Sequence, residues 1–199
     1  MTTFLLIRHG ECDTGGLIAG RTRGYHLTEK GRSQAQALAE RLSGLTISAL
    51  FSSPLERTAE TAGYVSSRQE QLPVVFKEEL IELNYGDWTG LPMHSIINDD
   101  QWRQFSRFRG AYRIPGGEMM LEVASRMSCF TETIRRRHEG IVAIVSHGDP
   151  LKALIAHYTG VPLDATARFD LQPASVTILR IDDYGSQLEC LNNTGVICL

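Results

Sequence analysis

Two segments far apart in the chain share one pattern, an apolar run that ends at a His-Gly pair. They are residues 5–10 and residues 143–148. A buried strand that ends in a glycine turn places its histidine at the carboxyl end, the edge where open α/β sheets bind ligands. We therefore expect His9 and His147 to face one pocket. Arg8 adds a permanent cation, so the pair suits a phosphate group attacked by an imidazole, and poorly suits a hydride acceptor or a nucleic-acid groove.

Composition narrows the class of protein. A chain of 199 residues with 42% hydrophobic and 22% charged residues is typical of one globular domain. A net charge of −3 argues against nucleic acid or an anionic membrane as partner. No basic and apolar leader opens the chain, and no apolar run reaches the roughly 18 residues of a membrane span.

The cysteines indicate a compartment. Cys12, Cys129, Cys190 and Cys198 have neither CxxC spacing nor the density of a disulfide scaffold. We expect free thiols in a reducing environment, which predicts a cytoplasmic protein. Its oligomeric state is left open by the sequence, with a homodimer as one option.

Strand-like and helical patterns alternate through residue 159. Short apolar runs predict strands over residues 3–8, 47–51, 72–76 and 141–146, with helices between them. The tail predicts a hairpin over residues 175–192. This order favours a three-layer α/β sandwich, in which helices flank a mainly parallel central sheet.

Capping residues suggest where the helices begin. Thr28 is an expected N-cap for the first helix. Ser52-Ser53-Pro54 resembles a capped helix start with proline in the first position, leading a helix over residues 55–65. Asp149-Pro150 is expected to start the helix that follows His147 and ends at Gly160.

The segment at about residues 91–115 is expected to form a small helical cap inserted in a single domain spanning residues 1–199. It mixes arginines with aromatic residues, namely Trp102, Phe105, Phe108 and Tyr112. These aromatic side chains are equally suited to covering a ligand pocket and to packing the cap itself.

Cleavage of a phosphomonoester requires cations, an in-line nucleophile and an acid for the leaving oxygen. His9 is the nucleophile candidate, and Arg57, in the helix after the second strand, joins Arg8 as a candidate phosphate clamp. His147 adds a second imidazole. Glu82 is an acid candidate beside a glycine-broken aromatic loop, and Glu78, Glu79 and Asp87 compete with it on the sequence alone.

Together these residues resemble the histidine phosphatase superfamily, in the branch that includes phosphoglycerate mutases and small-molecule phosphatases such as α-ribazole phosphatase. Six motifs occur in the family's order along nearly the whole chain. They are Arg8-His9-Gly10-Glu11, Leu27-Thr28-x-x-Gly31-x-x-Gln34-Ala35, Ser52-Ser53-x-x-x-Arg57-x-x-x-Thr61-Ala62, Leu80-x-Glu82-x-x-Tyr85-Gly86-x-Trp88-x-Gly90, Pro115-Gly116-Gly117-Glu118 and Ser146-His147-Gly148.

The resemblance implies a phosphoglycerate mutase-like fold and a role for each core residue. His9 resembles the phosphorylated nucleophile, and Arg8, Arg57 and His147 resemble the phosphate pocket. The loop motif selects Glu82 as the proton donor. The family works without a metal or organic cofactor, apart from the bisphosphoglycerate primer of the mutases, so none is expected here.

The chain departs from the family pattern at the rim of this pocket. Cys12 stands where Ser or Thr is frequent, residues 13–16 replace a Trp-Asn pair, and Met119 stands where a Ser often follows Gly-Gly-Glu. Cys12, Arg21 and Arg23 are candidate substrate contacts.

We expect a metal-independent phosphatase that hydrolyses a small phosphorylated metabolite through phospho-His9. The short segment after the Tyr-Gly loop favours a phosphatase over the longer mutases. Two alternatives are a phosphoglycerate mutase-type phosphotransferase and a non-catalytic phospholigand-binding protein. A metal site built from His9, Glu82 and His147 conflicts with the surrounding arginines.

Overall fold

The computed structural model describes residues 1–197, and the predicted central sheet is confirmed in this part of the chain. Within these residues the sheet has six strands in the order β3-β2-β4-β1-β5-β6. The strands are β1 (Thr2–Arg8), β2 (Ile47–Ser52), β3 (Val74–Phe76), β4 (Gly140–Ser146), β5 (Val176–Ile181) and β6 (Ser186–Asn193). The first four are parallel, and the hairpin of β5 and β6 adds antiparallel strands at one edge.

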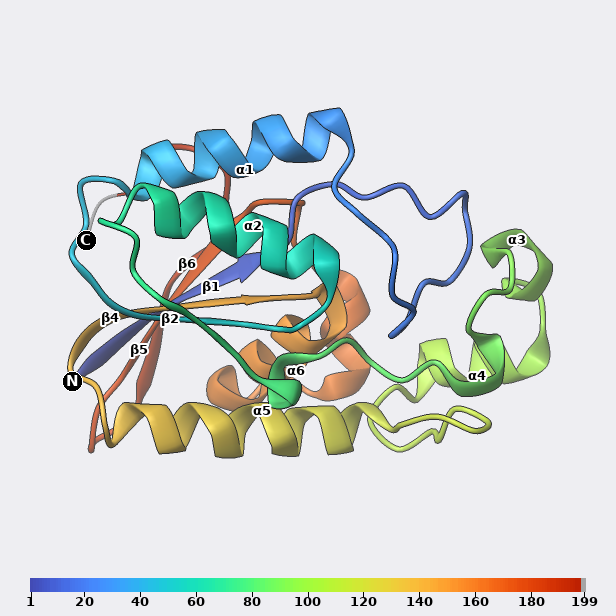
Figure 1. Ribbon diagram of the computed structural model, residues 1–199. Coiled ribbons are helices and arrows are strands. Elements are labelled where there is room, and N and C mark those ends of the chain that lie inside the picture. Colours follow the sequence, from blue (N-terminus) through green and yellow to red (C-terminus); the bar gives the residue numbers. More distant parts are fainter. Residues whose placement is uncertain (198–199) are drawn as a thin grey trace.

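Helices cover both faces of the sheet. They are α1 (Glu29–Leu42), α2 (Glu56–Ser67), α3 (Met93–Ile96), α4 (Asp100–Arg107), α5 (Met120–Arg135) and α6 (Gly148–Thr159), with short 3-10 turns at η1 (Glu78–Leu80), η2 (Gly86–Trp88) and η3 (Leu163–Arg168). In Figure 1, α1 and α2 lie above the sheet, and α5 and α6 lie below it. Helices α3 and α4 lie at one end, opposite the N-terminus.

The central strands are apolar on both faces, as expected of a sheet covered by two helical layers. Along β1, Phe4 and Leu6 join the hydrophobic cluster that includes side chains of α5 and α6. Leu5 and Ile7 join the second cluster, with side chains of α1 and α2. The continuous apolar run of β1 therefore fixes the middle layer of the sandwich.

One predicted helix start is confirmed and two are displaced. Thr28 caps α1, and its hydroxyl accepts from the Gly31 amide at 3.0 Å. The capped start at residues 52–54 was wrong, because α2 begins at Glu56 and the Ser53 side chain is held by His147 instead. Helix α6 begins at Gly148 rather than at Asp149, with His147 itself in the N-cap position.

Most of the aromatic residues in the segment predicted to form a cap pack on one another or on Trp88. Trp88 meets the rings of Trp102 and Phe105 at centroid distances of 5.3 and 5.6 Å, and it stacks on Tyr112 at 6.4 Å. Phe108 is 51% exposed, so it lies outside this cluster. Of the two roles suggested by the sequence, packing accounts for Trp102, Phe105 and Tyr112.

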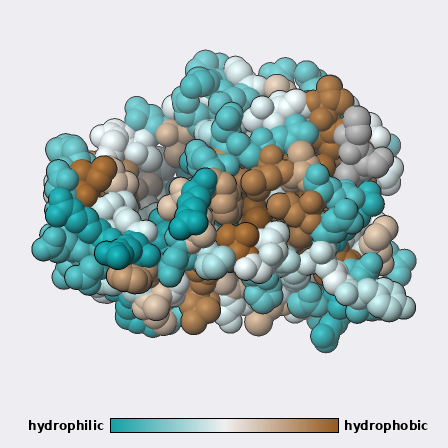
Figure 2. Space-filling model, turned by 180° about the vertical axis from the view of Figure 1, so that it is seen from behind, coloured by the Kyte–Doolittle hydropathy of each residue, from teal (hydrophilic) through white to brown (hydrophobic). Residues whose placement is uncertain are grey.

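The outer surface is mixed in polarity. Figure 2 shows a largely hydrophilic face with a hydrophobic region near its middle. Across residues 1–197, no helix combines the length and hydropathy that crossing a membrane requires.

Gly31 offers a test of how the loop that follows β1 packs on α1. A Cβ at Gly31 would lie 2.0 Å from the Glu11 carbonyl oxygen, so we expect Gly31→Ala to lower the free energy of unfolding by about 1–3 kcal/mol or more. Gly63, in α2, has no described heavy atom within 4 Å of such a Cβ. Gly63→Ala should leave the stability unchanged or raise it by up to about 1 kcal/mol. Urea unfolding of both variants checks this, and equal effects would contradict the close packing.

Candidate active site

The pairing of β1 with β4 brings the two histidines together. The parallel register runs to Arg8 opposite Ser146, so the next residue of each strand, His9 and His147, leaves the sheet at the same edge. The His9 amide donates to the Ser146 carbonyl at 3.1 Å, which extends the ladder into the turn. The two imidazole rings lie 5.2 Å apart between centroids, at an interplanar angle of 66°. The two histidines expected to meet at one edge of the sheet therefore lie side by side.

His9 is held with one ring nitrogen fixed. Its Nδ1 lies 2.7 Å from the Gly10 carbonyl oxygen. Because a carbonyl only accepts, Nδ1 carries the proton and Nε2 keeps its lone pair. Burial, followed by the charge of Arg57, lowers the pKa of His9 to about 3. The imidazole is thus neutral at physiological pH, the state that a nucleophile requires.

Arg57 is the most deeply placed cation of the site. It lies in the first turn of α2, is only 2% exposed, and donates through Nη2 to the Gly20 carbonyl at 2.9 Å. Its Nη1 is buried without a hydrogen-bond partner among residues 1–197. A buried guanidinium with an unused donor is costly unless an acceptor meets it, so this arrangement is suited to binding an anion.

Arg8 provides a second cation at the end of β1. Its Nη1 donates to the Leu171 carbonyl and lies 3.9 Å from a carboxylate oxygen of Asp170. Its Nε is also buried and has no partner in the described part of the chain. Arg8 and Arg57 both depress the pKa of His9, which agrees with their expected position around it.

His147 is fully buried and oriented by a serine. The Ser53 hydroxyl lies 2.8 Å from Nε2, while Nδ1 lies 3.9 Å from a carboxylate oxygen of Glu82. Burial, then the charges of Arg57 and His9, hold the pKa of His147 well below its usual value. Ser53 is a site residue that the sequence suggested only as a helix cap.

Glu82 is the carboxyl group that the structure brings beside His147, whereas Glu78, Glu79 and Asp87 are exposed. Its Oε1 accepts from the Leu83 amide at 2.8 Å. Burial, followed by the negative charge of Asp149, raises the pKa of Glu82 from 4.5 to about 7. A carboxyl group with this pKa is suited to give and take a proton near neutral pH.

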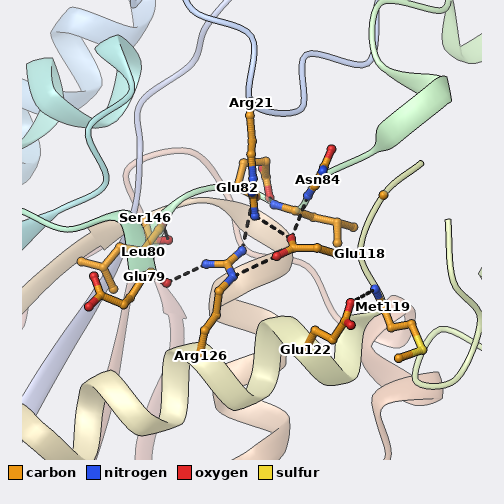
Figure 3. Close-up of polar contacts among 12 residues, drawn as sticks. Arg21, Glu79, Leu80, Glu82, Asn84, Glu118, Met119, Glu122, Arg126 and Ser146 are labelled. Atoms are coloured by element: carbon orange, nitrogen blue, oxygen red, sulfur yellow. Dashed lines mark hydrogen bonds and ion pairs between the residues drawn. The ribbon is translucent and has the colours of Figure 1, made fainter. Parts of the chain in front are cut away.

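Two arginines hold the Glu82 segment through its backbone (Figure 3). Arg21 donates to the Glu82 carbonyl at 2.8 Å, and Arg126 donates to the same oxygen at 3.3 Å. Glu118 lies between them, at 2.7 Å from Arg21 and 3.5 Å from Arg126. Its carboxylate also accepts from the Asn84 amide at 2.9 Å.

The ion pairs of Glu118 with Arg21 and Arg126 were not predicted from the sequence. The available signal was the Pro-Gly-Gly-Glu motif, of which Glu118 is the last residue. Arg21, a candidate substrate contact, has its guanidinium engaged with Glu118 and with the Glu82 backbone. Its role toward a substrate remains a prediction.

The other two rim candidates differ in exposure. Cys12 is half-buried, and burial raises the pKa of its thiol despite the nearby Arg57 and Arg8. Arg23 is exposed. Whether either contacts a substrate stays a prediction.

A metal site in a protein is usually built from several His, Cys, Asp or Glu side chains that lie close together. Within residues 1–197, no group of three or more His, Cys, Asp or Glu side chains is arranged to hold a metal ion.

The chain belongs to the histidine phosphatase superfamily (branch 1), whose pattern matches residues 4–194. It is 29% identical to phosphoserine phosphatase 1 of Hydrogenobacter thermophilus, covering 98% of this chain and 93% of that protein. It is also 29% identical to a 2,3-bisphosphoglycerate-dependent phosphoglycerate mutase of Thermoplasma acidophilum, covering 92% and 88%. The fold superposes on the α-ribazole phosphatase of Shigella flexneri with a TM-score of 0.85 at 28% identity, covering 99% of each chain.

The raised pKa of Glu82 has a consequence for stability. Because the folded protein binds this proton more tightly than the unfolded chain, the stabilisation is complete below pH 4.5 and is lost as the pH rises through about 7. Glu82→Gln has no proton to lose. We expect its free energy of unfolding, relative to that of the wild type, to be larger at pH 8 than at pH 4.5 by roughly 1–3 kcal/mol, because only the wild type loses stability as the pH rises. Urea unfolding at the two pH values checks this, and a constant difference would contradict it.

Proposed function

We propose that the protein is a phosphomonoester hydrolase that acts on a small phosphorylated metabolite through phospho-His9. One observation carries the proposal, namely a neutral imidazole with Nε2 free beside buried arginine donors that have no partner among the described residues. A phosphate dianion supplies the acceptors that these donors require. The phosphatases among the relatives support the same class of reaction.

In the first step the Nε2 lone pair of His9 attacks phosphorus, and the bond from phosphorus to the ester oxygen breaks. Arg8, Arg57 and His147 bind the nonbridging oxygens and stabilise their charge. The Ser53 hydroxyl donates to Nε2 of His147, so that Nδ1 carries a proton toward the phosphate. Glu82 gives its proton to the leaving alkoxide, which departs as an alcohol.

In the second step the Glu82 carboxylate accepts a proton from water as the water oxygen attacks phosphorus. The bond from phosphorus to Nε2 breaks, which frees inorganic phosphate and restores neutral His9. Glu82 ends protonated, as it began. No metal ion is needed in this scheme, because the arginines supply the positive charge.

A phosphotransferase of the mutase type is the second candidate, because a mutase relative matches nearly the whole chain. Its similar length removes chain length as an argument against a mutase. A requirement for a bisphosphate primer would distinguish a mutase from a hydrolase. A binding protein without turnover is the third, and it has no use for an acid such as Glu82.

We propose a cytoplasmic location, because the cysteines are of the kind expected in a reducing compartment. Cys12, Cys129 and Cys190 are free thiols, while Cys198 lies outside the described residues.

Hydrolysis of an aryl phosphate in the presence of EDTA tests the proposal. We expect the wild type to turn over, and His9→Ala to lose at least about a thousandfold in kcat/KM because the nucleophile is gone. His157→Ala is the matched control, since His157 is an exposed histidine of α6. Loss of wild-type activity on adding EDTA would contradict a metal-independent reaction.

The choice of acid can be tested separately with two kinds of leaving group. Glu82→Gln should slow hydrolysis of an alkyl phosphate by about 10²–10⁴-fold, because an alkoxide needs a proton to leave. An aryl phosphate, whose leaving group is a weaker base, should be slowed much less. Glu79→Gln, at an exposed carboxylate near Glu82, is the control. Equal slowing of both substrates would argue against Glu82 as the acid.

A further inference from the structure

Asp149 joins three separate segments at the rim of the site. It lies in the first turn of α6, two residues after His147, and its side chain is 14% exposed. One carboxylate oxygen accepts from the Tyr85 hydroxyl, and the other accepts from Arg109 Nη2 at 2.5 Å. Tyr85 lies three residues after Glu82, and Arg109 lies two residues after the end of α4. A single carboxylate thus ties α6 to the Glu82 loop and to the cap.

Both partners are themselves fixed. Arg109 is 12% exposed in its side chain, and its guanidinium carbon lies 4.7 Å from the centre of the Phe105 ring, which is fully buried. Burial, then the charges of Asp149 and Glu82, raise the pKa of Tyr85 well above its usual value, so the phenol remains a donor. The cluster of Tyr85, Asp149 and Arg109 therefore has one defined arrangement.

We propose that Asp149 is a positioning residue for Glu82, acting on the acid through its charge and through Tyr85, and that Arg109 of the cap segment opposes that charge. The inference rests on the proposed phosphatase function and deepens it. It assigns the cap a part in the reaction, because the segment after α4 carries the cation that balances Asp149.

The charges around Glu82 set the direction of each effect. Arg57 from α2 and Arg8 from β1 favour the carboxylate form of Glu82, whereas burial and Asp149 from α6 favour the acid. His147 faces it from the end of β4, and Arg21 and Arg126 bind its backbone carbonyl from the first loop and from α5. Besides burial, the charge of Glu82 in turn contributes to the raised pKa of the Cys12 thiol.

Removing Asp149 and removing Arg109 should therefore have opposite effects. Asp149→Asn keeps the shape and removes the negative charge, so Glu82 should release its proton at lower pH. Arg109→Gln leaves the charge of Asp149 without its cation, so Glu82 should keep its proton to higher pH. A purely structural role would not separate the two variants in this way.

The experiment is a ¹³C NMR titration of the Glu82 carboxyl carbon, identified as the signal absent from Glu82→Gln. We expect its midpoint to fall by at least about 0.5 pH unit in Asp149→Asn and to rise in Arg109→Gln. The basic limb of kcat against pH for an alkyl phosphate should move in the same directions. For an aryl phosphate the limb should move much less.

Asp164→Asn is the matched control. Asp164 accepts from the Gly110 amide at 2.8 Å, so it anchors the same segment as Arg109 from η3. The proposal is overturned if Asp149→Asn leaves the midpoint unchanged, if both variants move it in one direction, or if Asp164→Asn moves it as far. Absence of turnover in the wild type would instead refute the phosphatase function, and the titration would still decide whether Asp149 governs Glu82.

Discussion

The parallel pairing of β1 with β4 is the constraint on which the site depends. Seven residues of each strand are in register, and the ladder ends with Arg8 opposite Ser146. A slip of one residue would reverse the faces of the apolar side chains and would also separate His9 from His147. Since both strands are buried on both faces, the two helical layers enforce one register. The hydrophobic core and the closeness of the two histidines thus have a common cause.

The second constraint is the presence of two positively charged arginines beside the buried histidines. Arg8 and Arg57 lie beside two imidazoles, and both histidines stay neutral because burial and the arginines disfavour a further positive charge. Glu82 experiences the opposite balance, in which burial and Asp149 outweigh the arginines. The same site therefore holds a neutral imidazole and a carboxyl group with a pKa of about 7, the two groups that the proposed cleavage of a phosphomonoester requires.

Glu82 lies on a loop, and loops are usually less rigid than the elements that they connect. Here Arg21 and Arg126 donate hydrogen bonds to its backbone carbonyl, and Glu118 forms an ion pair with each of them. Tyr85, farther along the same loop, contacts Asp149, which in turn binds Arg109. Much of the buried polar structure around the site therefore positions one carboxyl group. The residues that do this come from segments far apart in the chain, so the position of Glu82 depends on the arrangement of all of them.

The sequence by itself determined the layers and the core of the site. Apolar runs and helical periodicity predict the sandwich, and the two strand-His-Gly patterns predict that His9 and His147 meet, because strand ends and glycine turns are local features. Arg57 follows from its position in the helix after the second strand, whereas only the resemblance to the histidine phosphatase family selects Glu82 among its competitors. Local capping rules failed at residues 52–54, because the Ser53 hydroxyl forms a hydrogen bond with His147 instead of capping a helix.

Only the tertiary structure decided what surrounds these groups. It shows that the three competitors of Glu82 are exposed, and that Arg21 is engaged with Glu118. It also reveals the contacts of Asp149 with Tyr85 and Arg109, which lie 64 and 40 residues away in the chain. The physical reason is that pKa values and side-chain partners depend on burial and on charges brought close by folding. These quantities have no signature in the order of the residues.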